Sequence, residues 1–251
     1  MRDVQIRHPD IVGTWRVNGV NWRIEPGDFW AVGGLHWSGK TNLLLTLAGV
    51  NLRARGALSL FGRELEALNA EEALRERLRI GLVFGGDGRL LPDLTVAENV
   101  ALPLRYLRGV DDKAMETRVR QVLDELALLD AAAELAGAVD LACRRRAALA
   151  RAVILEPEVL LFDQPLGGLD PRQRAWWRDL IDELHAGHAL LDSRPAAIVV
   201  ATEDLRPWRD RAGQFALLDE GRFHVVGDRE AMSKCDHPLV RELHLHESTK
   251  D

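Results

Sequence analysis

The feature that most constrains the fold of this chain is the loop at residues 34–41, which has the pattern G-x-x-x-x-G-K-[ST]. In such a loop backbone N–H groups surround a phosphate, and the following helix adds the positive end of its dipole. The apolar run 29–32 predicts a buried strand before the loop, and residues 42–48 predict a helix after it. This context indicates a phosphate-binding loop in which Lys40 reaches the β- and γ-phosphates and Thr41 holds Mg²⁺.

The composition narrows the class of protein. Of the 251 residues, 47% are hydrophobic and 29% are charged, as in an ordinary globular protein. No run approaches the ~20 apolar residues of a membrane span, and the N-terminus has no signal-peptide pattern, so we expect a cytoplasmic protein. Two cysteines, Cys143 and Cys235, predict neither a disulfide framework nor a zinc site. A net charge of −6 argues against a nucleic-acid partner.

The order of elements predicts the fold class. Short strands are expected at 4–7, 17–24, 28–33 and 56–61, then buried apolar strands at 80–84, 159–162 and 196–201. Helices are expected at 95–107, 112–129, 144–155 and 172–184. Apolar strands alternating with helices are typical of a mostly parallel sheet covered on both faces. We therefore expect an α/β P-loop NTPase core with an N-terminal antiparallel β subdomain and an inserted helical subdomain.

We expect one domain over residues 1–251. The α/β core with its β subdomain takes residues 1–84 and 156–235, the helical subdomain 85–155, and a C-terminal helix and tail 236–251.

Several segments resemble the ATP-binding subunit of an ABC transporter. Residues 147–152 and 155–163 are similar to that family's signature helix and second acidic strand, 168–171 to its D-loop, and 218–222 to its late hairpin. Residues 94–105, 144–152 and 237–243 look closest to the Mla/Mce-type lipid transporters, although amino-acid importers share part of that pattern.

The resemblance implies a cassette attached to a membrane permease at the inner face of the cell membrane. Two such subunits, as a homodimer or a heterodimer, hold ATP between the P-loop of one and the signature motif of the other. The resemblance also implies that Mg²⁺ is held by Thr41 and Asp163, and that the D-loop is Gly168, Leu169 and Asp170. The nucleotide-binding residues implied are Gly34, Trp37, Ser38, Gly39, Lys40, Thr41 and Asn42.

Three catalytic positions of that family are altered here. The catalytic glutamate is Gln164, whose amide offers a water no anionic proton acceptor. The switch histidine is Glu203, a carboxylate that would repel the γ-phosphate. The Q-loop glutamine is Gly85, which has no side chain to contact Mg²⁺ or the permease.

The signature motif, usually Leu-Ser-Gly-Gly-Gln or -Met, is altered throughout. Asp140 replaces the serine hydroxyl with a negative charge, and two unit charges ~4 Å apart at an effective dielectric of ~20 cost roughly 4 kcal/mol. Side chains at two further positions obstruct close approach of a phosphate. The positions that correspond to the motif are Val139, Asp140, Leu141, Ala142 and Cys143.

Five further features have two interpretations each. Trp37 replaces a loop glycine, so the loop is either distorted, with Trp37 folded over the pocket, or binds phosphate normally. Trp15 is either an adenine-stacking residue or an ordinary tryptophan, with the second favoured. The apolar face of 95–107 belongs either to the core or to the permease groove. The arginines 144–146 form either an anion or lipid-headgroup patch or a solvated face, with the solvated face favoured. Trp176 and Trp177 belong either to a partner surface or to internal packing, with packing favoured.

Two functions remain open, and the pattern of replacements favours the first. The first function is that of a pseudo-ATPase subunit of a transporter, possibly a lipid transporter. Such a subunit binds nucleotide weakly or not at all and has a structural or regulatory role on the permease. The alternative is an active subunit that couples ATP hydrolysis to transport. A soluble ABC protein of repair or translation is disfavoured, because those usually carry duplicated cassettes or coiled-coil insertions. The sequence does not identify the transported molecule.

Overall fold

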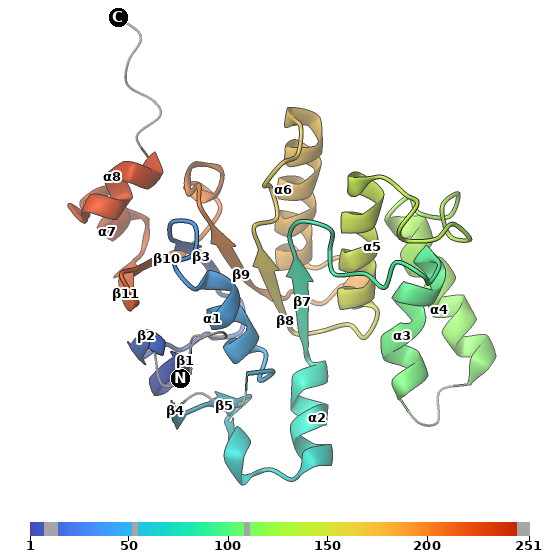
Figure 1. The fold of residues 1–251 in the computed structure, drawn as a ribbon, viewed down its shortest axis with the longest axis horizontal. Coiled ribbons are helices and arrows are strands. Elements are labelled where there is room, and N and C mark those ends of the chain that lie inside the picture. Colours follow the sequence, from blue (N-terminus) through green and yellow to red (C-terminus); the bar gives the residue numbers. More distant parts are fainter. Residues whose placement is uncertain (8–14, 52–54, 108–110, 245–251) are drawn as a thin grey trace, which may run out of the picture. The chain divides into compact units, whose positions relative to one another are not determined.

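The computed structural model describes residues 1–7, 15–51, 55–107 and 111–244. The chain forms two compact units, one of Met1–Ile80 with Ala197–Asp251 and the other of Gly81–Ala196 (Figure 1). The second unit contains strands as well as helices, so it is larger than the helical subdomain expected at 85–155. Of the C-terminal helix and tail expected at 236–251, residues 245–251 lie outside the described residues.

The first unit is built on a mixed sheet. Strand β3 is parallel to both of its neighbours, β9 and β10, whereas the pairs β1–β2, β1–β4 and β10–β11 are antiparallel. The fold class predicted from the sequence is thus confirmed. The strands are β1 (Arg2–Arg7), β2 (Trp15–Val20), β3 (Phe29–Gly33), β4 (Arg55–Ala57), β5 (Ser59–Leu60), β6 (Arg63–Glu64), β9 (Ala197–Thr202), β10 (Gln214–Asp219) and β11 (Arg222–Gly227).

The helices of the first unit are α1 (Lys40–Leu47), α2 (Ala70–Leu78), α7 (Arg229–Ser233) and α8 (Pro238–His244), with single 3-10 turns at Leu65–Ala67 and Arg206–Trp208. Helix α8 packs at the start of the phosphate-binding loop. A Cβ at Gly33 would lie 2.7 Å from side-chain carbons of both Leu205 and Leu243. The Leu243 side chain of α8 therefore lies directly against the end of β3.

The second unit contains β7 (Ile80–Phe84), β8 (Val159–Asp163), α3 (Val96–Tyr106), α4 (Asp112–Glu125), α5 (Leu141–Val153), α6 (Pro171–Ala186) and a 3-10 turn at Ala189–Leu191. Helix α3 packs against α4 and α5. Its residues Val96, Val100 and Leu104 are buried, which assigns that apolar face to the core. Thr95 and Glu98 form a capping box that fixes the start of α3.

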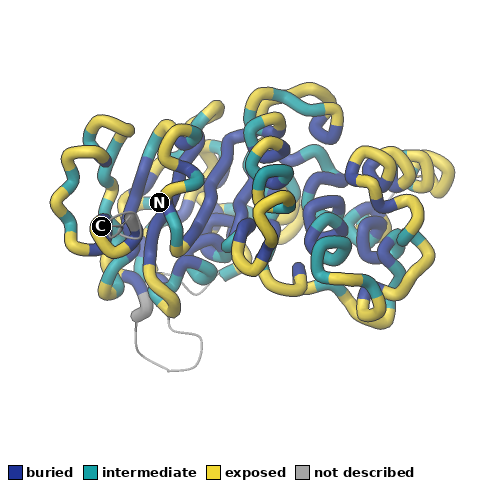
Figure 2. The backbone as a smooth tube through the Cα atoms, turned by 90° about the horizontal axis from the view of Figure 1, so that it is seen from above, coloured by how far each residue is buried: buried dark blue, intermediate teal, exposed yellow. Residues whose placement is uncertain are grey.

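The buried residues follow the strands and the inner faces of the helices in each unit (Figure 2). Every residue of β3 and of β9 is buried, as the unalternated apolar runs predicted. Among the described residues, no helix is both long enough and apolar enough to span a membrane.

Candidate functional site

The loop that follows β3 leads directly into α1 and is held at both ends by its backbone. The N–H of Gly34 donates to the Thr202 carbonyl at 3.1 Å, and a Cβ on Gly34 would lie 2.6 Å from the Ser38 hydroxyl oxygen. Gly39 precedes α1 with φ 106°, a conformation that favours glycine. No acidic side chain lies in the first turn of α1, and no side chain caps it. The positive end of the α1 dipole therefore lies at the loop.

Lys40 is buried, with 5% of its surface exposed. Its Nζ donates to the carbonyl oxygens of Gly34 and Leu35, each at 2.7 Å, and lies 3.4 Å from the Ser38 hydroxyl. The lysine thus holds together the two ends of its own loop.

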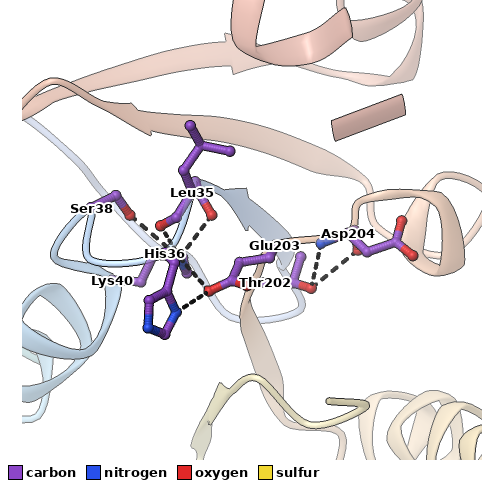
Figure 3. A network of polar contacts seen from close by, with 8 residues as sticks. Leu35, His36, Ser38, Lys40, Thr202, Glu203 and Asp204 are labelled. Atoms are coloured by element: carbon purple, nitrogen blue, oxygen red, sulfur yellow. Dashed lines mark hydrogen bonds and ion pairs between the residues drawn. The ribbon is translucent and has the colours of Figure 1, made fainter. Parts of the chain in front are cut away.

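Glu203 belongs to this loop site although it lies far away in the sequence. It directly follows β9, and its Oε1 lies 3.6 Å from Nζ of Lys40 and 3.1 Å from Nδ1 of His36 (Figure 3). A carboxylate therefore faces the lysine that the motif assigns to phosphate. The sequence predicted repulsion between Glu203 and a γ-phosphate, and the geometry adds a direct ion pair with Lys40.

Trp37 does not lie over the loop. Its side chain is 79% exposed and stacks edge-on against His36, with ring centroids 5.0 Å apart. The expectation that Trp37 folds over the pocket is wrong, because the backbone turns there with φ 63° and directs the side chain into solvent. Trp37 is thus a non-glycine residue in the left-handed region, a conformation that is costly for a side chain. Trp15 begins β2, and its side chain lies outside what the structure describes.

In the second unit, β8 ends at the buried Asp163, and Gln164 follows with φ 52°. Gly85 lies directly against these two residues. A Cβ at Gly85 would lie 2.6 Å from the Asp163 carbonyl oxygen and 3.0 Å from that of Gln164. The position expected to carry the Q-loop glutamine thus has no room for a side chain in this structure.

Asp140 caps helix α5. Its Oδ1 accepts a hydrogen bond from the Cys143 N–H at 2.7 Å, and α5 begins at the next residue, Leu141. The carboxylate is held at the helix N-terminus, where a helix otherwise offers N–H groups and positive potential to an anion. Burial is the main factor that raises the pKa of the Cys143 thiol, with the Asp140 charge next.

Helix α5 also holds the loop that follows β7. Arg145 is 5% exposed and donates from Nε to the Gly86 carbonyl at 3.0 Å. Burial lowers the pKa of Arg145. The prediction of a solvated face for arginines 144–146 is wrong, because Arg145 is buried and Arg146 lies over the ring of Trp176 at 4.5 Å. That contact, with Trp177 only 3% exposed, confirms packing for the tryptophan pair.

The D-loop segment forms a compact turn before α6. Gly168 has φ 71°, and the Asp170 side chain caps α6 by accepting from the Gln173 N–H at 2.9 Å. The carbonyl of Leu169 accepts from Arg174 Nε at 2.8 Å.

The residues fit ATP and Mg²⁺ only in part. The loop backbone and the α1 dipole suit one phosphate, and the Thr41 hydroxyl and the Asp163 carboxylate are oxygen groups of the kind that Mg²⁺ prefers. A terminal phosphate, however, would face the Glu203 carboxylate, which lies 3.6 Å from Lys40 Nζ. The charges at this loop thus suit a terminal phosphate less well than a phosphate inside the loop.

The family profile for ABC transporters matches residues 17–167. The chain belongs to the ABC transporter family. It is 32% identical to the lipoprotein-releasing system ATP-binding protein LolD of Alcanivorax borkumensis, over 82% of this chain and 86% of that protein. It is 28% identical to the methionine import ATP-binding protein MetN of Carboxydothermus hydrogenoformans, over 97% of this chain and 70% of that protein.

A solved dimeric ATP-binding cassette, in a post-hydrolysis state with ADP and Pi, has the same fold. The TM-score is 0.75 at 25% identity, covering 88% of this chain and 94% of that one. This chain spans only part of some relatives, for example 63% of the length of the MetN of Lacticaseibacillus paracasei.

Two features of the site were not predicted from the sequence. The contact of His36 with Glu203 joins residues 167 positions apart, so only the pairing of β3 with β9 reveals it. The capping role of Asp140 had a local signal, because aspartate directly before a helix is a common N-cap.

Proposed function

We propose that this chain is the cassette subunit of a membrane transporter in which ATP hydrolysis is very slow or absent. Its role is to brace the permease, or an intact ATPase partner, in one conformation. The retained D-loop turn at Gly168–Asp170 and the intact α3 core support a subunit that still assembles. We place it at the inner face of the cell membrane, as a homodimer or a heterodimer.

The observation that carries the proposal is the carboxylate of Asp140 fixed at the N-terminus of α5. In the family this helix start faces the partner's γ-phosphate. Here Asp140 occupies the Cys143 N–H and adds a negative charge, so it opposes the charge that develops during phosphoryl transfer. Gln164 stands in the place of the general base, and because its amide cannot take up a proton from the attacking water, phosphoryl transfer is weakened further.

The test is release of inorganic phosphate from Mg-ATP by the full chain, compared with a Lys40→Ala variant that reveals contaminating ATPases. We expect the two rates to be equal within error. Turnover of 1 s⁻¹ or more, on the order of ordinary enzymes, that disappears in Lys40→Ala would establish the alternative, an active ATPase subunit.

We further propose a lipidic cargo. The segments 94–105, 144–152 and 237–243 resemble the Mla/Mce-type lipid transporters, and one relative belongs to a lipoprotein-releasing system. Purifying the tagged chain from the solubilised membranes of its own host, followed by mass spectrometry, should yield a permease with bound phospholipid. A permease that carries only small polar solutes would refute the lipid assignment.

A further inference from the structure

Glu203 is held beside Lys40 by the sheet. Strand β9 pairs with β3 so that Thr202 lies opposite Gly33, and the Thr202 carbonyl accepts from the Gly34 N–H at 3.1 Å. The Thr202 hydroxyl donates to the Asp204 carbonyl and accepts from the Asp204 N–H, both at 3.1 Å, which fixes the turn (Figure 3). Glu203 therefore starts from a fixed backbone position next to the loop.

The carboxylate is in a position to balance the charge of the buried lysine. Its Oε1 lies 3.6 Å from Nζ of Lys40, whose other contacts include the carbonyls of Gly34 and Leu35. His36 Nδ1 lies 3.1 Å from the same oxygen. A buried cation needs a nearby anion, and in a loaded P-loop a phosphate provides it.

We propose that Glu203 supplies the anion that a terminal phosphate would otherwise supply, so that this site prefers a nucleoside diphosphate to a triphosphate. The loop N–H groups and the α1 dipole, with no acid in the first turn of α1, serve the phosphate inside the loop. The lysine charge beyond it is balanced by the chain itself. A γ-phosphate brings a further negative charge to within a few ångströms of the Glu203 carboxylate and meets repulsion.

This inference rests on the proposed function and deepens it, because both concern the same P-loop. The two are tested separately, because one predicts a rate and the other a ratio of binding constants. A chain that prefers ADP and also hydrolyses ATP would refute only the proposed slow or absent hydrolysis. A chain that does not hydrolyse ATP and shows no preference for ADP would refute only the diphosphate preference.

The experiment is calorimetric titration of the full chain with ADP and with the slowly hydrolysed analogue ATPγS, each in Mg²⁺, for the wild type and for Glu203→Gln. Glutamine keeps the size of the side chain and removes its charge. Glu66→Gln is the matched control, because it removes one negative charge from an exposed residue of the same unit. Thermal unfolding of each variant verifies that it folds.

We expect the wild type and Glu66→Gln to bind ADP at least tenfold more tightly than ATPγS. In Glu203→Gln the affinity for ATPγS should rise at least tenfold, which narrows or removes the preference for ADP. Three results overturn the proposal: equal affinity of the wild type for both nucleotides, unchanged ATPγS affinity in Glu203→Gln, or no binding of either nucleotide to either protein.

Discussion

Gly85 stands at the position where the resemblance expects the Q-loop glutamine, and its surroundings leave no room for a side chain. It follows β7, and its Cα lies so close to the backbone of Asp163 and Gln164 that any Cβ would approach their carbonyl oxygens at 2.6 and 3.0 Å. Backbone oxygens of a strand end cannot move aside as the tip of a side chain can. A glutamine restored at position 85 would therefore force β7 and β8 apart.

We expect Gly85→Ala to lower the free energy of unfolding by about 1–3 kcal/mol, the usual cost of overpacking. Gly167→Ala is the matched control, because its Cβ would meet the Gln164 carbonyl at an ordinary 3.6 Å. That variant should stay within about 0.5 kcal/mol of the wild type. Urea denaturation measures both, and equal stability of the two variants would show that the backbone at position 85 can relax.

Helix α2 is an element whose stability depends on pH. Asn69 and Glu72 form a capping box at its start, and Glu76 accepts from Arg79 at 2.6 Å and from Arg63 at 3.3 Å. The hydrogen bond from Arg79, and then that from Arg63, hold the pKa of Glu76 below its usual value. The hydrogen bond from Arg63 does the same for the pKa of Glu72.

Because the folded-state pKa of Glu76 lies below the unfolded one, its contribution to stability is present above the unfolded pKa. The contribution is lost as the pH falls through the folded pKa. We expect the wild type to melt at a higher temperature than Glu76→Gln at pH 7, and the difference to shrink progressively below pH 4.5. Melting curves at successive pH values test this. A difference that stays constant into the acid range, or one that equally accompanies Glu66→Gln, would contradict it.

The extent of several elements was predicted from the sequence only approximately, for physical reasons. The strand expected at 56–61 is divided into β4 and β5, with the break at Leu58, and Gly56 within β4 has φ 87°. The helix expected at 112–129 ends at Glu125, and Ala127 adopts φ 51°. Helix α5 begins before the expected residue 144 because Asp140 caps it. Apolar periodicity locates an element, whereas caps and left-handed residues decide where it ends.

At the scale of the whole molecule, local motifs predicted the fold, but they did not predict contacts between residues that lie far apart in the sequence. The P-loop, the apolar strands and the order of helices were sufficient for the α/β class. The ion pair of Lys40 with Glu203 and the close approach of Gly85 to Asp163 depend on which strands become neighbours. Spacing alone carries no information on such contacts. The resemblance put Glu203 near a γ-phosphate, but its ion pair with Lys40 emerged only from the structure.

The altered positions should act together, which makes restoration of one of them ineffective. Gln164→Glu returns a proton acceptor worth a factor of ~10²–10⁴ in ordinary general-base catalysis. If Glu203 and Asp140 oppose a terminal phosphate as we propose, that acceptor has no properly held phosphate to act on. We expect phosphate release by Gln164→Glu to remain at the level of Lys40→Ala.

The triple variant Gln164→Glu/Glu203→His/Asp140→Ser removes both carboxylates, and serine can still cap α5. We expect it to release phosphate at least tenfold faster than Gln164→Glu alone, in a manner abolished by adding Lys40→Ala. Full activity of Gln164→Glu alone would show that the two carboxylates do not obstruct the phosphate. An inactive triple variant that still binds ATPγS would instead locate the remaining defect at a position still altered: Gly85, whose packing forbids a side chain, Trp37, or Leu141 and Ala142.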